Sequence, residues 1–439
     1  MKKFRSAVLI LPFFLLFSGF TADCAPPAAG GGEPPDTEEA RLADEPAAGS
    51  LQDAAPEAAS VSSAAALPPF SLGPAVDERY DRGIAFMYRL EFDKAELEFR
   101  DIIKLDTANP AGYFALAALS WWRYSQNFDV QADFKGLEDE FMRNAENTIK
   151  VSKAGLKRGL APDHAYFFMG SAYGIEGRWH AVQKNWFRAY LRGNKGRKLL
   201  RKSVKLNPGL YDAYLGLGIF DYFADALPEI LKIPALLFLR GDKARGLSEV
   251  RLALEKGRFF SLEARLFLIE ILTRHEKNLK AALDEVEKLK ATDPSNMFFR
   301  LGEILTLVHG EAWQKVIEEC GRFLEDYKRL SPPGLAQQLS LVYLSAGDAW
   351  LALNKPEEAA RRFTDGIALT AFPQKGWVTY CYLRRGQAMD LLGKRGDAVR
   401  DYRMVMRRDN FWDSRKYGKR ALKKAPDFKE IYRQLMETD

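Results

Sequence analysis

The chain has 439 residues, 47% hydrophobic and 28% charged, so it can bury a substantial core and is too long for one small domain. Its three cysteines, Cys24, Cys320 and Cys381, exclude a disulfide-rich scaffold and a four-cysteine zinc site. The net charge of +6 is unevenly distributed, because residues 25–70 hold eight acids against one arginine and residues 71–439 are strongly basic. A basic folded part favours anionic partners without specifying one.

Residues 1–24 have the features of an export signal. Three of the first five residues are basic, and residues 7–20 form an apolar run that is short for a membrane span. Cys24 occupies the position of the acylated cysteine in a bacterial lipoprotein, although Asp23 beside it is unusual there. We therefore expect an exported, periplasmic lipoprotein anchored through Cys24. Secretion without an anchor and an intracellular protein with a retained leader are the alternatives.

Residues 25–70 are rich in Ala, Pro, Gly and Glu and contain almost no aromatic residue. Such a segment cannot bury enough apolar surface to offset the entropy lost on ordering, which predicts a disordered linker. A linker of this length reaches tens of ångströms, on the order needed to hold a folded domain away from a membrane surface.

From about residue 77 onward, apolar residues recur at spacings of three and four, which predicts helices throughout residues 71–439. A glycine is followed by an alanine twelve residues later in three segments, as listed in these pairs: Gly83 and Ala95, Gly347 and Ala359, Gly386 and Ala398. This pattern resembles the tetratricopeptide repeat (TPR), a helix–turn–helix unit of 34 residues. The resemblance covers about eight units between residues 76 and 412. It implies an all-α fold, an α-solenoid in which helical hairpins form a right-handed superhelix.

Two segments interrupt the repeat, near residues 125–160 and 224–240. Around the second, a Tyr-rich helix, a Leu-Pro insertion and a Gly-Asp-x-x-x-Gly-Leu run beginning at Gly241 are similar to the Iml/tetratricopeptide-domain-39 branch of TPR proteins and to bacterial TPR lipoproteins. This closer resemblance covers residues 206–257 only.

The TPR resemblance implies that the first helix of each hairpin lines a concave groove. Transferred by register, the aromatic lining residues are Tyr80, Tyr88, Phe114, Trp122, Phe167, Tyr222 and Phe223. Aromatic side chains suit an apolar helix, an extended peptide or a lipid chain. The Lys and Asn residues of chaperone-binding TPR proteins are missing at the corresponding positions, which disfavours that partner class. The opposite interpretation is equally open: residues 224–240 fold back into the groove and the aromatic residues are core.

Residues 394–424 carry twelve Lys and Arg against four Asp. The basic patch that we expect there consists of Arg400, Arg403, Arg407, Arg408, Lys419 and Arg420. It would suit an anionic membrane surface or an acidic partner, and the alternative is an ordinary solvated helix face. We expect no nucleic-acid partner for an exported protein.

The sequence contains no phosphate-binding glycine loop, no HExxH, no GxSxG and no CxxC motif. His164 and His180 are expected to be structural rather than metal ligands. We therefore expect no enzyme and no cofactor, but a protein–protein interaction scaffold or adaptor of the bacterial cell envelope, including its outer membrane. The alternative is a solute-binding or transporter-accessory lipoprotein, which would contain an enclosed apolar ligand pocket.

Overall fold

The computed structural model describes residues 70–126, 134–159, 161–183, 185–226, 241–332, 334–369 and 371–437. Within these ranges every regular element is a helix, which confirms the all-α prediction. The helices are α2 (Pro74–Tyr88), α3 (Phe92–Leu105), α4 (Ala111–Ser125), α5 (Lys135–Lys157), α6 (Pro162–Val182), α7 (Trp186–Leu206), α8 (Ala213–Ala226), α9 (Lys243–Lys256), α10 (Ser261–Glu270), α11 (Leu279–Thr292), α12 (Met297–His309), α13 (Trp313–Leu330), α14 (Leu339–Ala352), α15 (Pro356–Ile367), α16 (Gly376–Leu391), α17 (Arg395–Arg407), α18 (Ser414–Lys423) and α19 (Phe428–Glu437). A π-helical turn, Ile271–His275, extends α10.

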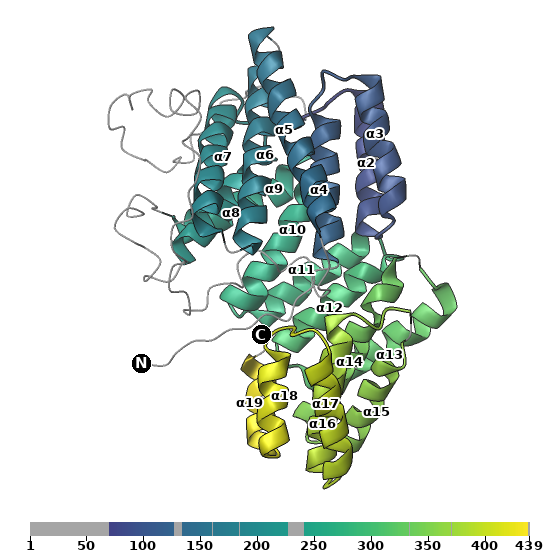
Figure 1. The fold of residues 1–439 in the computed structure, drawn as a ribbon. Coiled ribbons are helices and arrows are strands. Elements are labelled where there is room, and N and C mark those ends of the chain that lie inside the picture. Colours follow the sequence, from purple (N-terminus) through teal and green to yellow (C-terminus); the bar gives the residue numbers. More distant parts are fainter. Residues whose placement is uncertain are drawn as a thin grey trace. The chain divides into compact units, whose positions relative to one another are not determined.

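Consecutive helices pack as hairpins from α2/α3 to α16/α17, followed by α18 and α19 (Figure 1). Each hairpin also packs on the next, and the first helices contact one another from α2 to α8 and again from α12 to α18. Stacked hairpins of this kind bury a core that neighbouring units share. The predicted α-solenoid is therefore confirmed.

The turn inside each regular hairpin contains a residue in the left-handed conformation. Leu90, Asn354 and Gly393 have φ angles of 61°, 56° and 72° and lie seven residues after the glycine of their unit. A left-handed residue ends the first helix and reverses the chain within a few residues, so the second helix packs back on the first. Glycine and asparagine tolerate this conformation, whereas Leu90 adopts it at an energetic cost.

The three regular glycines make room for an aromatic ring of the second helix. The pairs, each sixteen residues apart, are Gly83 with Phe99, Gly347 with Phe363 and Gly386 with Tyr402. A β-carbon on residue 386 would lie only 2.6 Å from the Cε1 atom of Tyr402. The alanines that follow these glycines by twelve residues are fully buried, and the aromatic ring fills the space over each glycine.

The hairpins α6/α7 and α8/α9 pack differently, with backbone against backbone. A β-carbon on Gly177 would lie 3.0 Å from the backbone nitrogen of Gly193, and one on Gly218 would lie 2.6 Å from the carbonyl oxygen of Gly246. These helices therefore approach each other through paired glycines rather than through a glycine and a ring. Helix α5 occupies most of the interruption expected near residues 125–160.

Polar side chains near the loops between hairpins form hydrogen bonds to residues that are far away in the sequence. The carboxylate of Asp212 accepts hydrogen bonds from the backbone N–H groups of residues 258–260, at 2.6 to 3.0 Å. Asn296 donates to the carbonyl of Tyr88 at 3.3 Å, and the fully buried Lys375 donates to the carbonyl of Gln126 at 2.8 Å. The second half of the array is therefore attached to the first helices of the N-terminal half.

Candidate functional site

The aromatic residues predicted to line a groove are all buried in the structure. They lie on the first helices α2, α4, α6 and α8, and each residue exposes at most 4% of its surface to solvent. They are Tyr80, Tyr88, Phe114, Trp122, Phe167, Tyr222 and Phe223. In this conformation none of these seven side chains offers an open surface to a partner.

Residues of the second half of the array cover these aromatic side chains. The ring centroids of Tyr80 and Phe259 lie 5.0 Å apart, and those of Trp122 and Phe298 lie 5.9 Å apart. Phe260 contacts the aromatic residues of α4 and α6 in the same way. The expectation of an open aromatic groove is therefore corrected. The inner face of the first hairpins packs against the loop before α10 and against α12, so large apolar residues that line it become core.

Tyr222 and Phe223 on α8 pack on the π-helical turn after α10. The hydroxyl group of Tyr222 donates a hydrogen bond to Glu276 at 2.7 Å, and the ring centroid of Phe223 lies 5.3 Å from that of His275. The insertion at residues 224–240, which one of the two interpretations placed in the groove, lies in its part 227–240 outside the described residues. Both of these aromatic residues are thus covered by α10 and its extension.

A buried cluster of ionisable side chains lies where α2, α6 and α10 meet. Tyr88 donates to Glu263 Oε2 at 2.8 Å, and Arg178 donates to Glu263 Oε1 at 3.3 Å. The guanidinium group of Arg178 also lies 4.2 Å from the ring centroid of Trp121. Burial raises the pKa of Tyr88 and lowers the pKa of Arg178. These groups are engaged with one another, so the cluster stabilises the contact between the two halves of the array.

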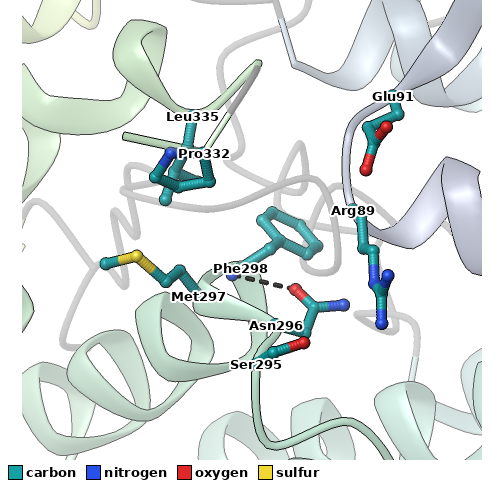
Figure 2. A pocket seen from close by; sticks show the side chains of 8 residues that line it. All are labelled: Arg89, Glu91, Ser295, Asn296, Met297, Phe298, Pro332 and Leu335. Atoms are coloured by element: carbon teal, nitrogen blue, oxygen red, sulfur yellow. Dashed lines mark hydrogen bonds between the residues drawn. The ribbon is translucent and has the colours of Figure 1, made fainter. Parts of the chain in front are cut away.

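A pocket of about 180 Å³ opens between the α2–α3 turn, the start of α12 and the residues before α14 (Figure 2). It is lined by Arg89, Glu91, Ser295, Asn296, Met297, Phe298, Pro332 and Leu335. Its polar groups have internal partners: Arg89 pairs with Asp293 at 2.7 Å, and Asn296 accepts from the N–H group of Phe298 at 3.0 Å. Ligand pockets usually enclose roughly 300–1,000 Å³ and are mostly apolar. This pocket therefore gives no support to the solute-binding alternative.

The inner face of the C-terminal half, formed by α14 and α16, carries polar side chains in an otherwise apolar setting. Arg384 is 1% exposed, and its guanidinium group lies 3.4 Å from Asp348 on the neighbouring first helix. It also donates to the side-chain oxygen of Gln387 at 3.1 Å. A buried charge is costly unless it is paired and hydrogen-bonded. Asp348 and Gln387 therefore hold the guanidinium group of Arg384 in place on this inner face.

The last helix, α19, contacts this inner face. Arg384 Nη2 donates to the backbone carbonyl of Gln434 at 3.2 Å, and Gln387 Nε2 donates to the side-chain oxygen of Gln434 at 2.6 Å. Ile431 and Leu435 are at most 5% exposed, so α19 buries a face with spacings of three and four. The C-terminal half thus holds a short amphipathic helix by apolar contact and by side chains that recognise its backbone and its amide.

Sequence reasoning missed this site, although two signals were visible. Arg384 and Gln387 interrupt an apolar first helix at a spacing of three, and residues 428–437 form an amphipathic pattern after Pro426.

The predicted basic patch is largely exposed. Arg400, Arg403 and Arg407 lie at spacings of three and four on the outer side of α17, and Lys419 and Arg420 are exposed on α18.

Arg408 differs from the rest of the basic patch, because it is half-buried. It donates to the hydroxyl oxygen of Thr379 at 2.8 Å and to the carbonyl groups of Pro373 and Lys375. Arg408 is therefore corrected from a patch residue to one that joins α17 to the start of α16.

The remaining predicted residues carry no visible site. Cys320 and Cys381 are buried free thiols, and burial raises the pKa of each. His164 packs edge-on against Phe70 at 4.6 Å, and among the described residues no group of three potential metal ligands is found. The described helices include none that combines the length and the apolar character of a membrane span. Cys24 lies outside the described residues.

No protein-family model matches the chain, and no curated protein sequence matches it. Solved structures with some likeness include a tetratricopeptide repeat protein from Parabacteroides merdae, with 11% identity over 83% of this chain and 99% of that chain and a TM-score of 0.27. Rap protein complexed with Competence and Sporulation Factor has 12% identity over 83% and 100%, with a TM-score of 0.39. The P58(IPK) TPR domain has 12% identity over 82% and 99%, with a TM-score of 0.23. All three TM-scores are below 0.5, so the fold assignment depends on the helix pairs described above.

Proposed function

We propose that the chain is a non-enzymatic interaction scaffold whose inner face on α14 and α16 binds a short amphipathic helix of a partner protein. One observation carries this proposal: the same face already holds a helix of this kind, α19, through Arg384 and Gln387. Helix-in-groove binding is a common mode of peptide recognition by helical proteins.

The contacts of α19 define the chemistry of the partner. Its buried residues are an aliphatic residue, Ile431, an amide three positions later, Gln434, and a second aliphatic residue, Leu435. The guanidinium group of Arg384 binds a backbone carbonyl, which any helix end can supply, whereas Gln387 selects the amide. We infer that the partner presents the same three side chains on one turn of a helix.

A partner helix can displace α19 from the face of α14 and α16. It has ten residues, and isolated helices of that length are marginal in water. It follows α18 after only four residues, 424–427, and a short connection of this kind gives the helix a high local concentration at the face. A partner helix therefore competes with a tethered but individually weak ligand, and binding exchanges one helix for the other.

The scaffold acts in the bacterial cell envelope, tethered in the periplasm through an acylated Cys24 and residues 25–70. The support is the sequence: a basic start, an apolar run and a cysteine at residue 24, followed by a linker without aromatic residues. Mass spectrometry of the mature N-terminus tests this location. A diacylglyceryl-modified Cys24 is expected, and an unmodified Met1 would contradict it.

Fluorescence anisotropy tests the binding site. The labelled peptide corresponds to residues 425–439, and the protein is a chain that ends at Asp427. We expect saturable binding, and a Gln434→Ala peptide should bind about tenfold more weakly because Gln387 is left without its partner. The shortened chain must still unfold cooperatively; absence of binding to such a folded chain would refute the proposal.

A further inference from the structure

The charge of helix α7 is unlike that of the other long helices. Residues 186–206 contain eight Lys and Arg and no Asp or Glu. Two of the arginines have acidic partners on neighbouring helices: Arg197 lies 2.7 Å from Asp221 and Arg192 lies 3.5 Å from Glu176. The other basic residues continue along the helix and include exposed ones, namely Arg188, Lys198, Arg201, Lys202 and Lys205.

Two large apolar side chains are exposed at the start of the same helix. Phe187 is 70% exposed and Leu191 is 49% exposed, one helical turn apart. From Leu191 the successive steps to Lys198, Lys202 and Lys205 are seven, four and three residues, so these residues and Phe187 lie along one face of α7. We call these five residues the α7 stripe.

The opposite face of α7 is packed against the protein, so the α7 stripe faces solvent. Gly196 packs against the backbone of α6, where an added β-carbon would lie 2.7 Å from the carbonyl oxygen of Gly170. Leu200 is 3% exposed, and the buried Ser203 donates to the carbonyl of Asp163 at 2.8 Å. Because this face is packed along its length, the stripe is presented to solvent by a rigid element.

We propose that the α7 stripe docks the array onto an anionic lipid bilayer, with the lysines at the phosphate headgroups and Phe187 and Leu191 at the boundary between headgroups and acyl chains. Amphipathic helices that lie on membranes combine a basic face with large apolar side chains that enter this boundary. Each Lys or Arg near an anionic surface contributes roughly a fivefold increase in affinity.

The basic patch on α17 and α18 lacks the apolar half of this arrangement. Among the described residues, none of the exposed large apolar side chains falls within 395–424, whereas α7 contributes Phe187, Leu191 and Leu206. Binding to a phosphate polymer such as nucleic acid needs the charge but has no use for an exposed leucine. The combination on α7 therefore favours a lipid surface over a nucleic acid, and α7 over α17.

Vesicle co-sedimentation tests this docking surface. The protein is a chain that begins at residue 25, so that neither the leader nor an acyl group contributes to binding. The vesicles are phosphatidylcholine alone or an equal mixture of phosphatidylcholine and phosphatidylglycerol. We expect binding to the anionic vesicles only, and a loss of at least about 30-fold in affinity for Lys198→Glu/Lys202→Glu, which removes two basic side chains and adds two acidic ones. Phe187→Ser, which leaves the charge unchanged, should lose about tenfold.

The matched control is Arg403→Glu/Arg407→Glu on α17, which makes the same charge change at two exposed residues. It should reduce the affinity by less than about threefold, because these residues lie outside the stripe. An equal loss for both pairs would show that net charge alone drives binding and would overturn the proposal. Equal binding to both kinds of vesicle, or tighter binding to a short DNA duplex at the same ionic strength, would also overturn it. Unchanged melting temperatures show that the variants are folded.

Discussion

The ring of Tyr402 lies directly over Gly386, and its hydroxyl group donates a hydrogen bond to Asp390 at 2.8 Å. The ring packs on Gly386 and is fixed by the hydrogen bond of its hydroxyl group to Asp390. It cannot move away from the first helix without breaking this bond. The same relationship between a glycine and a ring sixteen residues later defines the three regular hairpins.

Gly386→Ala should lower the free energy of unfolding by about 1–3 kcal/mol, because the new methyl group would force the anchored ring of Tyr402 to shift. Gly321→Ala on α13 is the control, since nothing lies within 4 Å of an added β-carbon there. That substitution should be neutral or stabilise the helix by up to about 1 kcal/mol. Urea unfolding measures both changes. Equal effects of the two substitutions would show that the ring contact does not limit the approach of the helices.

Trp122→Ala should destabilise the chain by about 3–5 kcal/mol, because the side chain is buried between α4, α2 and α12. Phe187→Ala removes an aromatic side chain that is 70% exposed and should change stability by less than about 0.5 kcal/mol. Thermal unfolding of the two variants distinguishes a core residue from a groove residue. A Trp122→Ala protein as stable as the unmodified chain would restore the open-groove interpretation.

Glu270 should make stability fall as the pH rises toward 8. Burial raises the pKa of this carboxyl from its usual value near 4.5 to about 8, against the opposing effect of Arg274 and Arg178. The folded state keeps the proton that the unfolded state loses near pH 4.5. The contribution of Glu270 to the free energy of unfolding is therefore fully present below pH 4.5. It decreases by up to about 1.4 kcal/mol per pH unit between pH 4.5 and 8 and is lost above pH 8.

Glu270→Gln removes this ionisation, and its advantage over the unmodified chain should grow between pH 6.5 and 8.5. His275, whose pKa is lowered to about 4 chiefly by burial, is present in both proteins, so its own titration cancels in this comparison. Urea unfolding at several pH values provides the comparison. Parallel stability curves for the two proteins would show that Glu270 is ionised in the folded state.

Arg384→Met should destabilise the chain by about 3–5 kcal/mol, because Asp348 would remain buried without its partner. The double substitution Arg384→Met/Asp348→Leu should recover part of this loss, since an apolar pair leaves no buried charge. A double-mutant cycle, measured by urea unfolding, gives the coupling free energy between Arg384 and Asp348. Strictly additive effects would mean that the two side chains do not interact.

The sequence was sufficient to predict the hairpins because their contacts are local. Gly83 and Phe99, or Gly386 and Tyr402, are separated by sixteen residues, and the helical period together with the small residues predicts which faces meet. The glycines of α6/α7 and α8/α9 were visible too, but spacing alone does not reveal their backbone contact, because Gly177 and Gly193 are also sixteen residues apart.

The fate of the aromatic residues was not predictable in the same way. Tyr88 and Glu263 are hydrogen-bonded across 175 residues of sequence, and Trp122 meets Phe298 at a similar separation. Whether inner-face residues are open or covered depends on small rotations that accumulate from hairpin to hairpin. The spacing of residues within one hairpin gives no information about these accumulated rotations.

The candidate site shows the same division. The amphipathic pattern of residues 428–437 is evident in the sequence, and it predicts that one face is buried. That Gln434 meets Arg384 and Gln387 depends on how the chain turns back after α18, which three-residue and four-residue spacings do not determine.

The most direct test compares the affinity of the 425–439 peptide for the intact chain and for the chain that ends at Asp427, under the same conditions. If α19 occupies the face of α14 and α16 as a tethered ligand, the intact chain should bind the peptide at least about tenfold more weakly, because the peptide must displace a helix of high local concentration. Equal affinities for the two chains would place the peptide elsewhere and contradict the account.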